Sequence, residues 1–194
     1  PYRDSLPPLT LDNARQQLLR HARVLHLDGT QYANALAAAT LAKSNGVTIS
    51  LDGCSVQADN RQNLQLAAMA DILIVNAKYP FRVTGCDHLS DAMRELAALG
   101  DKKAVIATFG GDGCYAWLDG GLAHFPAAQV KAVDTTGAGD VFHGAYLAAY
   151  LQGNTKGTAL WVVVFVSIWK TFGISTIILV AAMQNVPGVL YEAA

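Results

Sequence analysis

The chain has 194 residues, of which 52% are hydrophobic and 15% are charged, and its formal net charge is −1. This length is sufficient for one domain with a sizeable core, so we expect residues 1–194 to form a single domain. The near-neutral charge argues against nucleic acid or an anionic membrane surface as a partner. Three cysteines, an odd number without the spacing of a metal site, indicate reduced thiols in a cytoplasmic protein.

Apolar periodicity and turn residues predict that helices and strands alternate along the chain. In chain order, we expect a helix over 11–22, a strand over 23–29, a helix over 31–45, a strand over 47–53, a helix over 60–70, a strand over 71–76, a helix over 90–99, a strand over 103–111, a hairpin over 114–125, a strand over 129–134 and a helix over 138–151.

Continuously apolar strands that alternate with helices are typical of βαβ units. The sequence therefore predicts an α/β fold with a mostly parallel central sheet and helices on both faces. Ligands of such sheets bind beyond the carboxyl ends of the strands. The residues expected there are polar, namely Asp28, Asp52, Asn76, Thr108 and Asp134. Turns alone can explain polar residues at strand ends, but their convergence on one edge favours a binding site.

Residues 158–183 form an apolar run that only Lys170 interrupts. Its two halves, of 12 and 13 residues, are shorter than the ~18–20 residues that a membrane span needs. We therefore expect buried segments in the apolar C-terminal part, residues 158–194, and no membrane as a partner. A membrane anchor in this part is the less favoured alternative.

The stretch DTTGAGD, residues 134–140, lies at the expected junction of a strand and a helix. Gly137 and Gly139 permit a tight turn and a close approach of the backbone to a ligand. The amides from Gly137 to Asp140 would then lie at a helix N-terminus, which is an anion site suited to phosphate. Asp140 would repel a bound phosphate, so its position makes sense if it takes a proton from a hydroxyl that attacks the phosphate. The alternative is an ordinary helix cap with a glycine turn.

The same stretch resembles the D-T-x-G-A-G-D signature of the ribokinase/PfkB family of carbohydrate kinases. TFGGDG, residues 108–113, is similar to the T-x-G-x-x-G nucleotide loop of that family, and residues 75–85 resemble its segment that begins at Asn and ends in Thr-Gly. VFHGA, residues 141–145, resembles the branch that contains sulfofructose kinase and ketohexokinase-like enzymes. The resemblance implies a ribokinase-like fold and ATP-dependent phosphoryl transfer to a hydroxyl of a small sugar or sugar derivative.

The resemblance also implies residue roles. Asp140 would be the catalytic base, and the amides of Gly137, Ala138 and Gly139 would stabilise charge on the transferred phosphoryl group. The residues implied in binding ATP with its Mg²⁺ are Asn76, Thr108, Gly110, Gly113 and Thr136.

Other implied roles concern a second cation and the acceptor. Asp134, with Thr136, would form a monovalent-cation site for K⁺. Asp28 and Asp52 would bind the sugar, or else serve only the turns at the strand ends. His143 lies one helical turn beyond Asp140, and we expect a local partner for it rather than contact with substrate.

Two departures from the family pattern leave alternatives open. Tyr79 stands where the N-x-x-E element of the family has the glutamate that organises Mg²⁺. The sequence also lacks the family's sugar-binding first third and its lid, so we expect a partial kinase with nucleotide-binding and catalytic parts. A nucleotide-binding pseudokinase without turnover is therefore an alternative function. A homodimer is a further alternative, since family members often dimerise through the lid.

Overall fold

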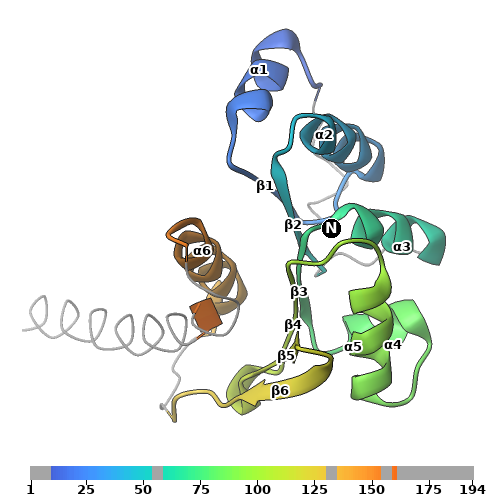
Figure 1. Ribbon diagram of the computed structural model, residues 1–194, viewed down its shortest axis with the longest axis vertical. Helices are drawn as coiled ribbons and strands as arrows, with labels where there is room; N and C mark the ends of the chain where they lie inside the picture. The colour runs from blue at the N-terminus through green and yellow to red at the C-terminus, as the bar shows by residue number, and fades with distance from the viewer. Residues whose placement is uncertain (1–9, 54–58, 130–134, 154–158, 161–194) are drawn as a thin grey trace, which may run out of the picture.

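The computed structural model describes residues 10–53, 59–129, 135–153 and 159–160. Its strands are β1 (Val24–Leu27), β2 (Thr48–Asp52), β3 (Ile72–Asn76), β4 (Ala104–Thr108), β5 (Cys114–Leu118) and β6 (Gly121–Phe125). They form one sheet in the order β1-β2-β3-β4-β5-β6 (Figure 1). The first four strands are parallel, and β5 and β6 add an antiparallel hairpin. The predicted α/β fold with a mostly parallel sheet is therefore confirmed.

The α-helices are α1 (Asn13–His21), α2 (Tyr32–Ser44), α3 (Asn60–Met69), α4 (Tyr79–Thr84), α5 (Leu89–Ala98) and α6 (Ala138–Leu151). An aspartate side chain caps the start of α1 and of α3. The Asp12 carboxylate accepts a hydrogen bond from the Arg15 amide at 2.9 Å at the start of α1, and Asp59 accepts one from the Arg61 amide at 3.0 Å at the start of α3. Each cap pairs an amide that the helix itself leaves without an acceptor.

Helices cover both faces of the sheet, as predicted (Figure 1). The helices α2, α3, α4 and α5 lie on one side, and α6 lies on the other. Side chains alternate along the central strand β3. Leu73 and Val75 belong to the core beneath α2–α5, whereas Ile72 and Ile74 belong to the core beneath α6. Because both faces of β3 are buried, its sequence is continuously apolar.

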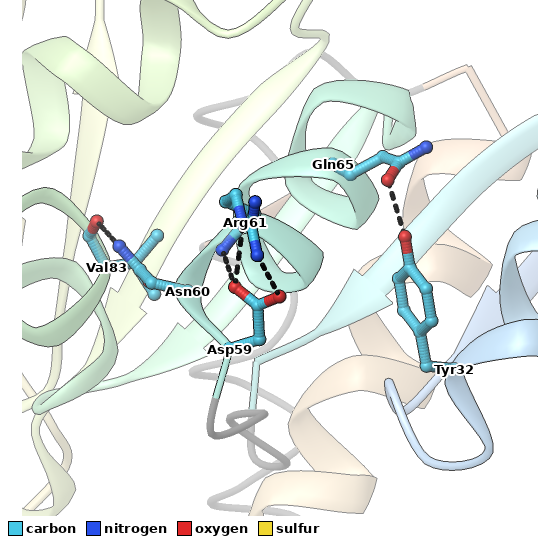
Figure 2. Close-up of polar contacts among 6 residues, drawn as sticks. All are labelled: Tyr32, Asp59, Asn60, Arg61, Gln65 and Val83. Atoms are coloured by element: carbon cyan, nitrogen blue, oxygen red, sulfur yellow. Dashed lines mark hydrogen bonds and ion pairs between the residues drawn. The ribbon is translucent and has the colours of Figure 1, made fainter.

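Polar contacts join α3 to both of its neighbours (Figure 2). The Tyr32 hydroxyl donates to Gln65 Oε1 at 2.5 Å and links α2 to α3. The Asn60 side-chain amide donates to the Val83 carbonyl at 2.9 Å and links α3 to α4. These bonds give the contacts between the three helices a preferred geometry, which apolar packing alone does not supply.

A 3-10 turn, Gly110–Asp112, replaces the end of the strand expected over 103–111, and the structure adds one α-helix that the sequence did not predict. It is α4, a short helix with Pro80 in its first turn and Gly85 in the left-handed region at its end. Six residues are too few for a recognisable helical period. Residues 130–134 of the strand expected over 129–134, and most of the apolar part 158–194, lie outside the described residues. Within the ranges given above, no helix is both long and apolar enough to cross a membrane.

Candidate active site

Polar residues end the parallel strands at one edge of the sheet. Asp52, Asn76 and Thr108 are the last residues of β2, β3 and β4, and Asp28 directly follows β1. Asn76 and Thr108 are register partners in neighbouring strands. The predicted convergence of these four residues is therefore confirmed. Asp134, the fifth, lies outside the described residues, so its role as a cation ligand stays a prediction.

The glycine turn before α6 has the predicted backbone geometry. Gly137 has φ 73° and immediately precedes the helix. Helical bonding begins with the Val141 amide, which donates to the Gly137 carbonyl at 3.0 Å. A Cβ atom on Gly137 would lie 3.9 Å from Asp140 Oδ2, so the Asp140 carboxylate lies over this turn. The proposed base and the start of the helix thus occupy one small region.

The amides of this turn are not equivalent. The Ala138 amide donates to the Thr135 carbonyl at 3.1 Å, so it is already engaged within the turn. The amides of Gly139 and Asp140 precede the first intrahelical bond. Space above Gly139 is open, because a Cβ atom there would meet nothing within 4 Å. The helix N-terminus therefore offers an anion chiefly the amides of Gly139 and Asp140, aided by the helix dipole.

The glycine loop after β4 folds back on itself. The Phe109 amide donates to the Gly113 carbonyl at 2.8 Å, and the Gly113 amide donates to the Gly110 carbonyl at 3.0 Å. Gly113 has φ 98°, and a Cβ atom there would lie 2.1 Å from the Phe125 carbonyl oxygen. By contrast, Cβ atoms on Gly110 and Gly111 would meet nothing within 4 Å. Gly113 is therefore required by the fold, while Gly110 and Gly111 leave room for a ligand.

Asn76 and Tyr79 shape the neighbouring start of α4. Asn76 Oδ1 accepts hydrogen bonds from the Lys78 amide at 3.0 Å and the Tyr79 amide at 3.2 Å. Tyr79 is 2% exposed, and burial raises the pKa of its hydroxyl to about 12. A Cβ atom on Gly53 would lie 2.6 Å from Tyr79 Cδ2, so the ring packs directly against that glycine. Tyr79 is therefore a core residue, and it puts no carboxylate at the edge of the sheet.

The edge still suits a magnesium ion that is carried by a nucleotide. In the part of the chain that the structure describes, no three His, Cys, Asp or Glu side chains gather as a metal cage. Magnesium in phosphoryl-transfer sites keeps several waters and is bound by substrate phosphates with one or two carboxylates. The anion-binding turn and the acidic edge match that mode of binding.

His143 has a polar partner, but that partner lies on another element and is not local in the chain as the sequence predicts. Its side chain is 8% exposed, and its Nε2 atom lies 3.5 Å from Asp52 Oδ2. The His26 ring is 5.1 Å from the His143 ring between centroids, and His26 Nδ1 lies 3.1 Å from Ser50 Oγ. Burial lowers the pKa of His26, the nearby His143 lowers it further, and the carboxylates of Asp52, Asp28 and Asp140 oppose these effects.

The two aspartates predicted to bind the acceptor, Asp28 and Asp52, differ in their exposure and in their contacts. Asp52 is 14% exposed at its side chain and lies against His143. Asp28 is exposed, and its Oδ1 atom accepts hydrogen bonds from the Thr30 amide at 2.9 Å and the Thr30 hydroxyl at 2.6 Å. Asp28 thus serves the turn after β1 while it remains open to solvent. The approach of Asp52 to His143 was not foreseen, since no local pattern links residues on different elements.

The pfkB family of carbohydrate kinases matches residues 5–167 of the chain. Aminoimidazole riboside kinase from Salmonella typhimurium is 39% identical over 94 residues, which are 48% of this chain and 29% of that protein. ATP-dependent ribose-1-phosphate kinase from Halopiger xanaduensis is 30% identical over 157 residues, which are 81% of this chain and 50% of that protein. The chain therefore spans half or less of the length of these curated relatives.

A solved structure has the same architecture. A candidate ribokinase II from Escherichia coli, in complex with ATP and Mg²⁺, is 22% identical and superposes with a TM-score of 0.67. The match covers 75% of this chain and 51% of that protein. This likeness identifies the fold as ribokinase-like.

Proposed function

The chain belongs to the pfkB family of carbohydrate kinases, and we propose that it forms the nucleotide-binding and catalytic part of an ATP-dependent kinase. The acceptor is a hydroxyl of a small sugar or sugar derivative. The observation that carries this proposal is the position of Asp140, whose carboxylate lies over the glycine turn that starts α6. A base beside an anion-binding helix N-terminus is the arrangement that attack of a hydroxyl on a phosphate requires.

In the proposed reaction, Asp140 accepts the proton of the attacking hydroxyl as the bond to the γ-phosphorus forms. The turn formed by Gly137, Ala138 and Gly139 stabilises the charge on the transferred phosphoryl group. The Gly139 and Asp140 amides act directly, and the engaged Ala138 amide holds the shape of the turn. One such donor is typically worth ~10²–10³ in turnover.

The nucleotide lies along the carboxyl edge in this proposal. Thr108, Gly110 and Gly113 form the loop that contacts the phosphates, and Gly110 supplies the open space beside them. Asn76 flanks the same edge as the register partner of Thr108. Magnesium on the phosphates neutralises part of their charge when bound. Asp134 and Thr136 form the K⁺ site.

The names of two relatives favour one class of acceptor. Two of them are named for riboside and ribose-1-phosphate substrates, so we favour a ribose-like ring. The branch that contains sulfofructose kinase and ketohexokinase remains part of the proposal on the basis of VFHGA, residues 141–145. Asp28, exposed at the end of β1, is the better placed of the two aspartates to meet an acceptor. We also propose that the protein is located in the cytoplasm and that it forms a homodimer.

One observation favours the alternative of a nucleotide-binding pseudokinase. Tyr79 is buried in the core and puts no carboxylate at the edge where the family has a glutamate. In that case the chain binds ATP without transferring its phosphoryl group.

Two measurements test the proposal. Titration calorimetry measures binding of Mg-ATP to the chain, and a phosphoryl-transfer assay measures turnover with riboside and sugar acceptors. Saturable binding with transfer is the expected result. Saturable binding without transfer to any acceptor would favour the pseudokinase. A folded chain that binds no nucleotide would overturn both functions.

A further inference from the structure

A polar cluster from three elements lies beneath the N-terminal half of α6. It consists of His26 on β1, Ser50 and Asp52 on β2, and His143 on α6, and we call it the histidine cluster. Ser50 is fully buried and His143, taken as a whole residue, is 6% exposed, whereas His26 is exposed. Buried polar side chains are costly unless they are paired, so this cluster imposes a specific arrangement on the elements that carry it.

The two nitrogens of His143 differ in their surroundings. Nε2 lies 3.5 Å from Asp52 Oδ2, whereas Nδ1 is buried and has no hydrogen-bond partner among the residues that the structure describes. The contact is a polar one between a ring nitrogen and a carboxylate oxygen. The Nε2 side of the ring is therefore the side that links α6 to β2.

This link attaches the first half of α6 to the sheet through polar groups. At the other end of the helix, an Arg23 guanidinium nitrogen donates to the Leu151 carbonyl at 2.8 Å, next to the start of β1. Between the two ends, Tyr146 and Ala149 belong to an apolar core. Apolar contacts have no preferred direction of their own, whereas polar contacts have a preferred geometry. The polar attachments therefore help to fix the axial position of α6 on the sheet.

His143 lies three residues after Asp140, so one helical turn connects the two. Any shift of α6 against β2 moves the Asp140 carboxylate and the anion-binding turn together. Phosphoryl transfer is sensitive to such shifts, because a misplacement of ~1 Å can cost ~10²-fold in rate.

We propose that His143 is a positioning residue, whose Nε2 contact with Asp52 holds the first turn of α6, and with it Asp140, in register with the strand ends. This inference rests on the proposed function for its effect on turnover. It assigns Asp52 to the support of the catalytic base rather than to the acceptor.

Two substitutions of the same residue separate this role from simple packing. Glutamine in His143→Gln can place its amide nitrogen near the position of Nε2, whereas asparagine in His143→Asn reaches only the position of Nδ1. We expect His143→Asn to raise amide exchange at Ala138 and Val141 by about tenfold, and His143→Gln to stay within about threefold of the wild type. Amides near Tyr150 at the far end of α6 serve as the internal control.

Nuclear magnetic resonance of the chain measures these exchange rates and needs no substrate. Equal exchange at Ala138 and Val141 in the wild type and both variants would overturn the positioning role. If His143→Asn fails to fold, Asp52→Asn replaces it. That variant keeps the shape of the side chain and removes its charge, and the same increase at the two amides is expected; no increase would overturn the proposal.

The turnover assay then links position to function. For His143→Asn we expect kcat to fall by about tenfold or more while KM for ATP stays within about twofold, with His143→Gln restoring most of kcat. If the wild type transfers no phosphate, the proposed function fails, yet the exchange rates still decide the positioning role. Normal kcat in His143→Asn would overturn the inference and leave the proposed function standing.

Discussion

The chemistry proposed for this chain depends on Asp140 and on the residues that surround its carboxylate. Gly137 lies beneath Oδ2, and a Cβ atom on Gly139 would meet nothing within 4 Å. A side chain at Gly137 would be strained, since φ is 73° there, in the left-handed region. The glycines therefore serve two purposes, because they allow the turn and keep the approach to the base free.

Replacing Asp140 with asparagine preserves the size of the side chain and removes the base. We expect Asp140→Asn to lower turnover by about 10²–10⁴-fold, the usual contribution of general base catalysis. Binding of Mg-ATP should be little changed, because the nucleotide loop is untouched. Steady-state assays and titration calorimetry measure the two quantities. Asp119→Asn is the matched control, since Asp119 is exposed in the hairpin turn at φ 50°, which asparagine tolerates. Turnover of Asp140→Asn equal to that of the control would contradict the assignment.

At the scale of elements, the loop after β4 combines a fixed end with an open middle. Gly113 is pressed against the end of β6, whereas Gly111 borders open space. The hairpin of β5 and β6 thus holds the loop in place while the loop keeps a free surface for a ligand. Such division of roles is usual where a rigid scaffold supports a binding loop.

Two alanine substitutions in this loop test that division. A Cβ atom in Gly113→Ala would lie 2.1 Å from the Phe125 carbonyl oxygen, at φ 98°. We expect a loss of about 2 kcal/mol or more in the free energy of unfolding for Gly113→Ala, and a change within about 0.5 kcal/mol for Gly111→Ala. Urea unfolding measures both. Similar stabilities of the two variants would contradict the steric argument.

The ends of α3 and α5 meet at one lysine. Lys102 Nζ donates to the Ala70 carbonyl at 2.7 Å and also to the Leu99 carbonyl. Burial and, to a smaller extent, the charge of Lys43 together lower the pKa of Lys102 from 10.5 to about 8, although Asp71 and Asp101 oppose them. Lys102 therefore joins two helix ends at the cost of some desolvation of its charge.

This lowered pKa makes stability depend on pH. Between pH 8 and pH 10.5 the unfolded chain keeps the Lys102 proton while the folded chain releases it. The unfolded state then binds more protons, so the contribution of Lys102 to stability rises with pH across this window. We expect the unfolding free energy of the wild type minus that of Lys102→Met to increase from the lower end of the window to the upper end. If this difference falls with pH instead, the pKa of Lys102 is raised in the folded chain and not lowered.

At the scale of the whole molecule, the sheet separates two cores that share the central strands. The side chain of Leu73 is fully buried in the core beneath α2–α5. On the other face, Ile72 and Ile74 pack in the core beneath α6. Because α6 carries the proposed base and the parallel strands carry the other edge residues, the second core joins the two parts of the candidate site.

Two leucine-to-alanine substitutions, one buried and one exposed, test how much burial in the sheet contributes to stability. We expect Leu73→Ala to lower the free energy of unfolding by about 2–5 kcal/mol, since a buried cavity adds to the lost transfer energy. Leu18, on α1, is 74% exposed, and Leu18→Ala should change the unfolding free energy by less than about 0.5 kcal/mol. Thermal or urea unfolding compares them. Equal losses would mean that burial in this sheet contributes little to stability.

Most of the fold could be predicted from local patterns. Apolar strands bounded by turns, alanine-rich helices and the Asp119–Gly121 turn act over a few neighbouring residues, so the expected elements that fall within the described residues are found near their predicted bounds. The helix α4 escaped prediction because it is short and because its start depends on the Asn76 side chain, which accepts bonds from the following amides.

The sequence by itself determined the order of strands and helices, the glycine turn before α6 and the set of polar residues that end the strands. Only the tertiary structure decided which of these groups touch. It brought His143 to Asp52, buried Tyr79 against Gly53 and engaged the Ala138 amide within its own turn. The physical reason is the separation along the chain over which each kind of interaction acts. Turn and periodicity preferences are local, whereas contacts between side chains far apart in the chain exist only after the sheet has set the positions of its helices.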